Sequence, residues 1–498
     1  MLLIDFTDQE EWISARFDNR VSANLRIRQG EFAGGQVVLG DAARENPFGP
    51  VALSAPGLVF SGKADRYDYD AWEQAAVRFN EMAAQGGENN TLAELISDID
   101  VHVGLLSAIG QELTDVRTQV RRASRLPGAA EESDPADPDS WLVSLENTLM
   151  KGDILFPDDV ARPWLVDLDY LRFAEDEAPE DPEAEVEEVD VLGEVVPSEL
   201  PAMDFHTDEL AIGTKQLGAW DFMLRPNADS ASISNLTMTT PDARIRDFSD
   251  QTGANLNWRY SNGKHISSFT GLFRATDLAR VLPGWGYDAN VESEQASFVS
   301  NLQWTGSPAA FSLEKVIGNV VVNINDGRFV DIDSGGSRLF GAFNLDSLVR
   351  RLQLDFSDLY EKGLAYDDIN GRLQFNEGVV RTDGPFQIDG PSSRIRLNGE
   401  LNMIRETIDA DMEVNVPLGQ NISVLAGILG AWPIALSTYI ASKIFKDQVN
   451  DFTTILYRLE GPWENPTSGF EPSEEILEAT EPVETPEQDA EAAAPAVP

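Results

Sequence analysis

Gly318-Asn-Val-Val-Val-Asn-Ile-Asn-Asp-Gly327 is the stretch of sequence that decides the fold. Val320, Val322 and Ile324 occupy alternate positions in it, which is the two-residue period of a β-strand with one apolar face. The strand is expected to end at Asp326-Gly327, a dipeptide typical of hairpin turns. Because an isolated hairpin is at best marginally stable, this strand predicts further strands beside it.

The same alternation recurs from Gly318 nearly to the end of the chain. Turn residues such as Glu377-Gly378 and Gly390-Pro391 follow several of the alternating runs. This arrangement predicts an antiparallel meander with one apolar and one polar face. The alternating apolar residues are Leu373 and Phe375, Phe386 and Ile388, Ile395 and Leu397, Leu401 and Met403, Ile408, Ala410, Met412, Val414 and Val416, then Ile455, Tyr457 and Leu459.

An internal repeat precedes this region. The segment from Asp100 to Leu113 aligns without a gap with the segment from Asp204 to Leu217, at an offset of 104 residues. Asp, His and Leu residues fall in register, and Arg121 aligns with Arg225. Each copy is expected to form two strands joined by a polar turn, so the fold is built from repeated strand units.

The formal net charge of -48 is distributed unevenly. Residues 175–199 contain twelve acids and no base, with several prolines, which predicts an acidic, proline-rich linker or loop over residues 175–200. It would separate a β-repeat region with short helices, 1–174, from a second β region, 201–470. The acidic tail, 471–498, is expected to be disordered. Such a charge disfavours nucleic acid and anionic lipid headgroups, so any membrane contact must be apolar.

Helices are expected to be few. The chain contains no cysteine, which excludes disulfides and thiolate sites, and residues 1–8 lack the pattern of a signal peptide. The apolar spacing of a helix is found in three short segments, and the last of them, 337–352, is expected to pack on the sheet edge. These segments are Tyr69 to Met82, Thr276 to Leu282 and Ser337 to Leu352.

Residues 414–442 carry no charged side chain, and a helical segment is expected over residues 418–446. Its length approaches the roughly 20 residues of a membrane-spanning helix, but Gly430 and Pro433 interrupt it. A spanning helix, a helical hairpin that caps the sheet, and insertion into one leaflet all stay open. The residues expected to contact a membrane or form the cap are Ile422, Leu425, Leu429, Trp432, Ile434 and Tyr439.

Motifs of catalysis are missing from the sequence. The histidines are His102, His206 and His265, the first two at equivalent repeat positions, and a structural or solvent-facing role is expected for them. The segment from Tyr366 to Glu377 matches several positions of a calcium loop but lacks its first ligand and flanking helices, so it is interpreted as a strand hairpin. No enzyme activity, metal or cofactor is expected.

The run from Leu345 to Leu359, followed by Lys362-Gly363, Gly371, Gly378, Gly390-Pro391-Ser392 and Gly399, resembles the carboxyl-terminal portion of YhdP-like proteins of the AsmA superfamily. The closing segment from Tyr457 to Trp463 is similar to that family as well. The resemblance implies a mainly β fold, an elongated, twisted antiparallel β-sheet groove of repeated strand units with a few short helices. It also implies an envelope protein anchored in the inner membrane by a helix upstream of this chain.

The function that the resemblance implies is phospholipid transport between the inner and outer membranes, in the periplasm and associated with membrane, with acyl chains as the partner. An upstream fragment anchored in the inner membrane would be a further partner. The alternative is a non-enzymatic β-sandwich scaffold in envelope or outer-membrane protein assembly, in which a second sheet covers the same apolar face. The residues expected to line the lipid groove are Val320, Val322, Ile324, Leu373, Phe375, Ile395, Leu397, Met412 and Val414.

Overall fold

Strands make up most of the described part of the chain in the computed structural model. Clustering of contacts gives two units: unit 1 comprises Met1–Ala289, Gln295–Val321 and Phe375–Glu377, and unit 2 comprises the rest. The structure describes residues 2–6, 11–68, 95–127, 140–173, 190–329, 364–417, 452–462 and 467–471, except for 19, 30, 48, 54–56, 109–110, 160, 286–288, 290 and 392–393.

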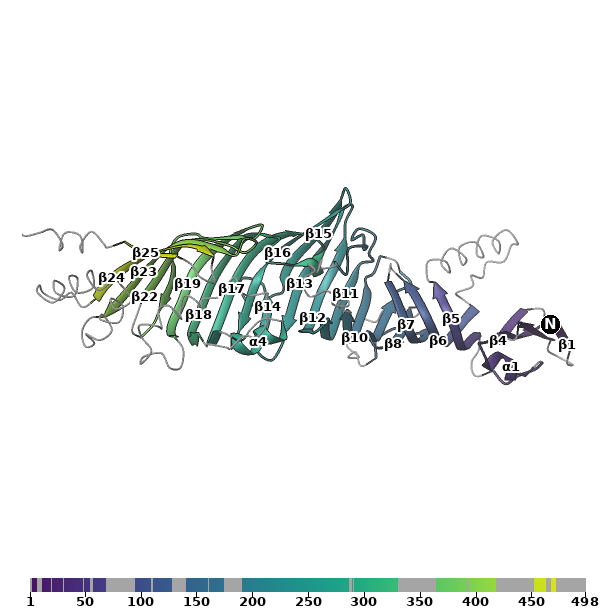
Figure 1. The fold of residues 1–498 in the computed structure, drawn as a ribbon. Helices are drawn as coiled ribbons and strands as arrows, with labels where there is room; N and C mark the ends of the chain where they lie inside the picture. Colours follow the sequence, from purple (N-terminus) through teal and green to yellow (C-terminus); the bar gives the residue numbers. More distant parts are fainter. Residues whose placement is uncertain are drawn as a thin grey trace, which may run out of the picture. The chain divides into compact units, whose positions relative to one another are not determined.

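The strands of unit 1 follow one another in the sheet mostly in chain order (Figure 1). The first ten are β1 Leu2–Phe6, β2 Glu11–Phe17, β3 Val21–Arg28, β4 Glu31–Leu39, β5 Leu58–Asp68, β6 Ile96–Ala108, β7 Gln111–Arg122, β8 Trp141–Glu146, β9 Met150–Phe156 and β10 Trp164–Phe173. They continue with β11 Met203–Ile212, β12 Lys215–Pro226, β13 Ser230–Thr239, β14 Ala243–Arg246, β15 Ala254–Ser261, β16 Lys264–Ala275 and β17 Val291–Thr305.

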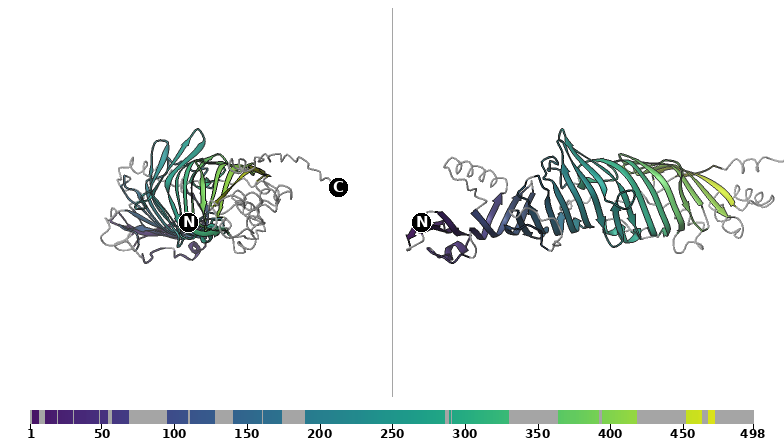
Figure 2. Two further views of the ribbon diagram at one scale, coloured as in Figure 1. Left: turned by 90° about the vertical axis from the view of Figure 1, so that its left-hand side faces the viewer. Right: turned by 180° about the vertical axis from the view of Figure 1, so that it is seen from behind.

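The remaining strands lie wholly or partly in unit 2, and Figure 2 shows the ribbon from two further sides. They are β18 Val316–Phe329, β19 Leu364–Asn376, β20 Val379–Thr382, β21 Phe386–Asp389, β22 Arg394–Asn402, β23 Thr407–Pro417, β24 Phe452–Pro462 and β25 Thr467–Glu471. The described helices are α1 Ala42–Glu45, α4 Leu278–Gly284 and the 3-10 turn η1 Pro308–Ala310. The expected mainly β fold class with few helices is therefore confirmed.

Turn chemistry explains why most neighbouring strands are antiparallel. Asn262 and Gly263, between β15 and β16, both have a positive φ, of 53° and 74°. Glu377 and Gly378, between β19 and β20, have φ values of 46° and 81°. Two successive residues with positive φ form the two-residue turn whose twist matches an antiparallel hairpin, as the sequence at Glu377-Gly378 predicts.

Three strand pairs are parallel, contrary to the expectation of a purely antiparallel meander. They are β4 with β5, β5 with β6, and β10 with β11. A parallel pair requires the chain to cross from one end of the sheet to the other between its strands. The connections at these junctions, residues 40–57, 69–95 and 174–202, are all long, and the last two are the longest within unit 1's strand series.

The internal repeat is confirmed as two hairpins of identical register. In the first, β6 pairs with β7 and His102 lies opposite Arg117; in the second, β11 pairs with β12 and His206 lies opposite Asp221. Each copy also begins with a strand that joins the preceding strand in parallel. The repeated unit therefore includes the parallel junction as well as the hairpin.

The turn expected at Asp326-Gly327 is wrong, because β18 continues through both residues to Phe329. Asp326 adopts a left-handed φ of 49° inside the strand. At Gly327 a Cβ atom would lie 2.0 Å from the carbonyl oxygen of Glu292 and 2.4 Å from the hydroxyl of Tyr366. Glycine here permits this close approach, so the Asp-Gly pair marks crowding within the sheet and not the end of a strand.

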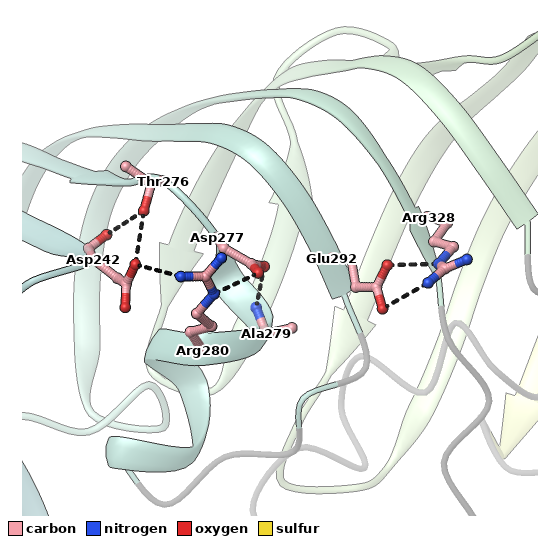
Figure 3. Close-up of polar contacts among 7 residues, drawn as sticks. All are labelled: Asp242, Thr276, Asp277, Ala279, Arg280, Glu292 and Arg328. Carbon is pink, nitrogen blue, oxygen red and sulfur yellow. Dashed lines mark hydrogen bonds and ion pairs between the residues drawn. The ribbon is translucent and has the colours of Figure 1, made fainter.

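The helix expected at 276–282 is confirmed as α4, two residues further along the chain (Figure 3). Asp277 caps it by accepting a 3.0 Å hydrogen bond from the backbone N–H of Ala279. Arg280 joins the helix to the strand connection at Asp242, with 3.3 Å between Nη1 and Oδ1. The other two expected helices, Tyr69 to Met82 and Ser337 to Leu352, lie outside the described residues.

Glycine also permits the close pairing of β9 with β10. Gly152, with φ of 148°, sits beside the register shift of β10 between Leu168 and Tyr170. A Cβ at this position would lie 2.3 Å from the carbonyl oxygen of Asp167 and 2.5 Å from the Cα of Leu168. The backbones of β9 and β10 can approach this closely only because residue 152 has no side chain.

Candidate functional site: an apolar face of the sheet

One face of unit 1 carries an unbroken row of apolar side chains from β2 to β12. Each residue of the row is the register partner of the next, across both parallel and antiparallel pairs. Register partners point to the same face of a sheet, so these side chains are neighbours. The long apolar row consists of Ala15, Ala23, Val37, Phe60, Ile99, Val120, Val143, Ile154, Val166, Phe205 and Phe222.

The side chains of this row are shielded only in part. Val166 is 8% exposed, whereas the other members are half-buried. At the β12 end, the rings of Phe205 and Phe222 stack with centroids 4.6 Å apart and planes 15° from parallel. A closed protein core buries such side chains completely, so this row lies on a face that is only partly covered.

A second apolar row continues on the same face towards β17. Leu224 lies two residues beyond Phe222 and therefore on the same side of β12. Its register partners lead across β13, β15 and β16 to β17. Four of these side chains are more deeply buried, for example Leu224 at 4% and Ile233 at 7% exposed, whereas Phe269 is half-buried. The row consists of Leu224, Ile233, Leu256, Phe269 and Leu302.

The opposite face of unit 1 carries a row of mostly acidic side chains from β6 to β12. A row of register partners runs from Asp100 through Gln119, Ser144 and Asp153 to Asp167, His206 and Asp221. Burial raises the pKa of Asp167. Burial of the ring lowers the pKa of His206, but the hydrogen bond and charge of Asp221, whose Oδ1 lies 2.7 Å from Nδ1, outweigh it and raise the pKa.

The histidines occupy two different environments. His102 and His206 lie on the polar face at equivalent repeat positions, each beside an aspartate: Nε2 of His102 is 2.8 Å from Oδ1 of Asp115. His265 lies on the apolar face of β16 and is 8% exposed. Its Nδ1 accepts a 3.0 Å hydrogen bond from the indole N–H of Trp258, so Nε2 carries the proton.

Residues 190–200, which we call the strap, lie on the apolar side of unit 1. The carbonyl oxygen of Gly193 accepts a hydrogen bond of 2.9 Å from Nε2 of His265. Oδ2 of Asp190 accepts a 2.8 Å hydrogen bond from the backbone N–H of Ser307, whose hydroxyl donates to the same carboxylate. The register partner of His265 is Tyr260, which lies two residues beyond Trp258 in β15. The side chains of His265 and Trp258 therefore point to the same face.

The prediction of a solvated linker is therefore wrong for residues 190–200. Pro197 is almost fully buried and Val195 is 9% exposed, since the strap packs on the sheet. The ladder between β10 and β11 joins the segments on either side of the predicted linker, and both strands belong to unit 1. Residues 174–189 lie outside the described residues.

In unit 2 the structure brings part of the predicted lining together. Ile395 is the register partner of Val414, and Leu397 is the partner of Met412. In β21, Ile388 is the register partner of Ile395 and Phe386 is the partner of Leu397, so each pair extends across a third strand. Two predicted lining residues, Val320 and Phe375, belong to unit 1 and are buried. In unit 2, Leu373 and Leu397 are half-buried, and the buried residues are Val322, Ile324, Ile395, Met412 and Val414.

Ion pairs occupy the other face of unit 2. Arg458 of β24 contacts Asp409 and, at 2.8 Å, Asp411, both in β23. Arg328 of β18 forms a two-point contact with Glu292, drawn in Figure 3. This charged face and the apolar rows alternate along each strand, so unit 2 has the same two-faced construction as unit 1.

Sequence reasoning missed the amino-terminal part of the apolar face. Ile99, Val101 and Val103 alternate in β6 as clearly as the residues of β18, so a signal was present. In β8 and β9 a clear alternation was absent, because Leu142 and Leu155 on the opposite side are also apolar. Both are fully buried and pack against Ala123, Leu126 and Leu165. Strands that are apolar on both sides do not show which side is the continuous face.

The predicted membrane-contact residues lie outside the described part of the chain. These are Ile422, Leu425, Leu429, Trp432, Ile434 and Tyr439 within residues 418–446. Among the residues that the structure does describe, no helix has the length and apolar character needed to traverse a bilayer. Asp368 and Asn370 of the near-match calcium loop lie in β19, where Asn325 and Asn323 donate to them, so the strand interpretation of that segment is confirmed.

Fold and site together define a repeat-built β protein in which each unit carries rows of apolar side chains on one face and charged side chains on the other. The chain belongs to the YhdP protein family, whose model matches residues 2–468. It is 20% identical over 312 residues to the "Intermembrane phospholipid transporter YhdP" of Escherichia coli strain K12. That match covers 61% of this chain but only 24% of the relative. No solved structure is significantly similar to the chain.

Proposed function

We propose that this chain carries phospholipid between the inner and outer membranes by letting acyl chains lie along its apolar face, which would form an open groove. The observation that supports this most is the long apolar row, which is unbroken from β2 to β12 and only half-buried. The printed name of the E. coli relative, an intermembrane phospholipid transporter, supports the same ligand class.

The dimensions of the row suit this task. Neighbouring strands lie about 4.8 Å apart, so a row from β2 to β12 is on the order of 45 to 50 Å long. The acyl chains of one leaflet extend over about 15 Å, half of the bilayer core. A lipid could therefore move by several of its own lengths without leaving an apolar surface.

The energetics favour a surface of this kind over a pocket. Each Å² of half-exposed apolar surface that an acyl chain covers stabilises the complex by about 25 cal/mol. Since equivalent side chains recur on every strand, a bound lipid gains little by stopping at any one of them. The headgroup stays in water, so the face needs no polar binding residues and no catalytic group, and we propose a non-enzymatic role.

The proposal is tested with the purified chain and vesicles that contain a phospholipid with a photoactivatable acyl chain. After illumination, mass spectrometry of the peptides locates the attached lipid. We expect attachment at Phe60, Ile99 and Phe205 of the long apolar row, with far less at Asp153 and Asp221 of the polar face. Attachment that is equal on both faces, or absent, would refute the groove.

A β-sandwich scaffold in envelope assembly requires a second sheet over the same face. Among the described residues of unit 1, each strand from β2 to β12 pairs with the one before it, in a single ladder, which favours the groove. We also propose a periplasmic location, membrane contact through residues 418–446 and an upstream inner-membrane anchor. Fractionation of cells that make the chain with its upstream sequence tests the location.

A further inference from the structure

We propose that the strap is a releasable cover of the apolar face, which lipid must displace to reach the face at β15, β16 and β17. This inference rests on the proposed lipid-carrying function and adds a regulated step to it. The strap occupies apolar surface of the same kind that elsewhere is left half-exposed. In the conformation described here, that section is therefore closed to acyl chains by the chain itself.

The side chains beside the strap's anchors are buried where the long apolar row is not. Trp258, Ser267 and Trp304 are register partners next to His265 and are 3%, 0% and 4% exposed. On the same face, Phe60 and Phe205 are half-buried. The strap lies on this side, as its contact with His265 requires, and the ring of Phe311 packs against Trp304 at its far end.

The strap's own side chains resemble a ligand of this face. Val195 and Pro197 are buried, and Val191, Leu192 and Val196 are half-buried. The carboxylates of Glu194 and Glu199 belong to exposed residues. An apolar side on the sheet with charges towards water is the arrangement that a bound phospholipid would adopt, so strap and lipid compete for the same surface.

Few contacts hold the strap in place. Its described polar contacts with the sheet are made at two points, by Asp190 with Ser307 and by Gly193 with His265. Its other described backbone hydrogen bonds are short turns of its own, such as Gly193 N–H to the carbonyl of Asp190 at 2.8 Å. None of residues 190–200 is a strand, so lifting the strap breaks no ladder.

The position of the strap in the chain also permits release. It belongs to the crossover that joins β10 to β11, and these strands are paired directly from Trp164 with Met203 to Phe173 with Ile212. The strap can therefore leave the apolar face while the pairing of β10 with β11 stays intact. Strap movement and sheet stability are separable.

A double substitution, Asp190→Cys with Ser307→Cys, tests the proposal, because the two side chains are in direct contact and the chain has no other cysteine. In the reduced protein the polar anchor is lost and the strap is freed. Oxidation, or a short bismaleimide, locks it. With vesicles of the photoactivatable phospholipid, we expect several-fold more lipid attached to the peptides of β15 to β17 in the reduced form than in the locked form.

Attachment at Phe60 should be the same in both forms, which makes it the internal control. A matched control pair is Arg381→Cys with Glu400→Cys, register partners on the polar face, where cross-linking should change nothing. Asp190→Ala, which has no thiol, should reproduce the reduced form. Bridge formation is verified from the mass of the intact chain.

The outcomes separate the strap from the groove. Equal attachment to β15–β17 in reduced and locked proteins, with normal attachment at Phe60, would overturn the strap proposal and leave the proposed function standing. No attachment at Phe60 in any form would overturn both. A lock that blocks attachment to β15–β17 alone supports both.

Discussion

Interrupting the long apolar row with one charge should stop lipid without unfolding the protein. Phe222→Glu is the sharpest version, because Phe222 lies at the β12 end of the row and is half-buried. Loss of its partial burial costs about 1 to 1.5 kcal/mol, half of the value for a fully buried phenylalanine. Loss of the stacked pair with Phe205 adds about 0.5 to 1.5 kcal/mol.

The new carboxylate at a half-exposed position can reach water, so the full penalty of a buried charge does not apply. The total, about 1.5 to 3 kcal/mol, is below the usual 5 to 15 kcal/mol of a folded domain. Urea unfolding followed by circular dichroism measures this loss. We expect photoactivated attachment at Phe222's neighbour Phe205 to fall sharply, while attachment at the distant Phe60 persists.

Phe222→Leu is the matched control, since it removes the ring pair but keeps the row apolar. It should lose stability by about 1 kcal/mol and keep lipid attachment at Phe205. If Phe222→Glu unfolds the protein outright, the face is a closed core and the groove is wrong. If the glutamate variant folds and binds lipid at Phe205 as before, the row is not the lipid's path.

Three further outcomes follow from burial and charge. Phe375→Glu should lower the free energy of unfolding by about 4 kcal/mol, because Phe375 is 5% exposed. Leu397→Glu, at a half-buried position, should lower it by less than about 2 kcal/mol. Similar urea midpoints for the two variants would contradict this expectation. Gly152→Ala should destabilise by more than about 2 kcal/mol and Gly263→Ala, which faces open space, by about 1 kcal/mol, as thermal unfolding can compare. The raised pKa of His206 contributes stability that is full below about pH 6.5 and is lost as the pH rises through that pKa. Solvent screening keeps this contribution under about 1 kcal/mol. His206→Gln should therefore flatten the dependence of the unfolding free energy on pH.

Strand content and the two-faced construction could be predicted from the sequence, because alternation is a local property of each strand. The turn at Glu377-Gly378 was predictable for the same reason, since Gly378 adopts positive φ without steric cost. The relative direction of neighbouring strands could not be predicted, because the two-residue period is the same in parallel and antiparallel pairs. The long connections at 69–95 and 174–202 indicated crossovers, but 40–57 did not stand out, because the equally long connection 123–140 joins the antiparallel strands β7 and β8.

The strap shows why composition alone could not predict the candidate site completely. Acidic residues with prolines predict a solvated loop, but Asp190 finds its partner Ser307 at a separation of 117 residues. Local sequence does not encode so distant a contact. The same limit applies to Asp326-Gly327, where crowding by Tyr366 and Glu292, and not a turn, accounts for the glycine.

The parallel junctions have a consequence for how the protein folds. Antiparallel strands joined by short turns close small loops, whereas the pairs β5–β6 and β10–β11 need loops of 27 and 29 residues to close first. Each repeat should therefore assemble as its own cooperative block, with the junctions as the last hydrogen bonds to form and the first to open. Amide hydrogen exchange would then show two weak lines across the sheet, one at Asp100 of β6 and one at its repeat equivalent, Asp204 of β11.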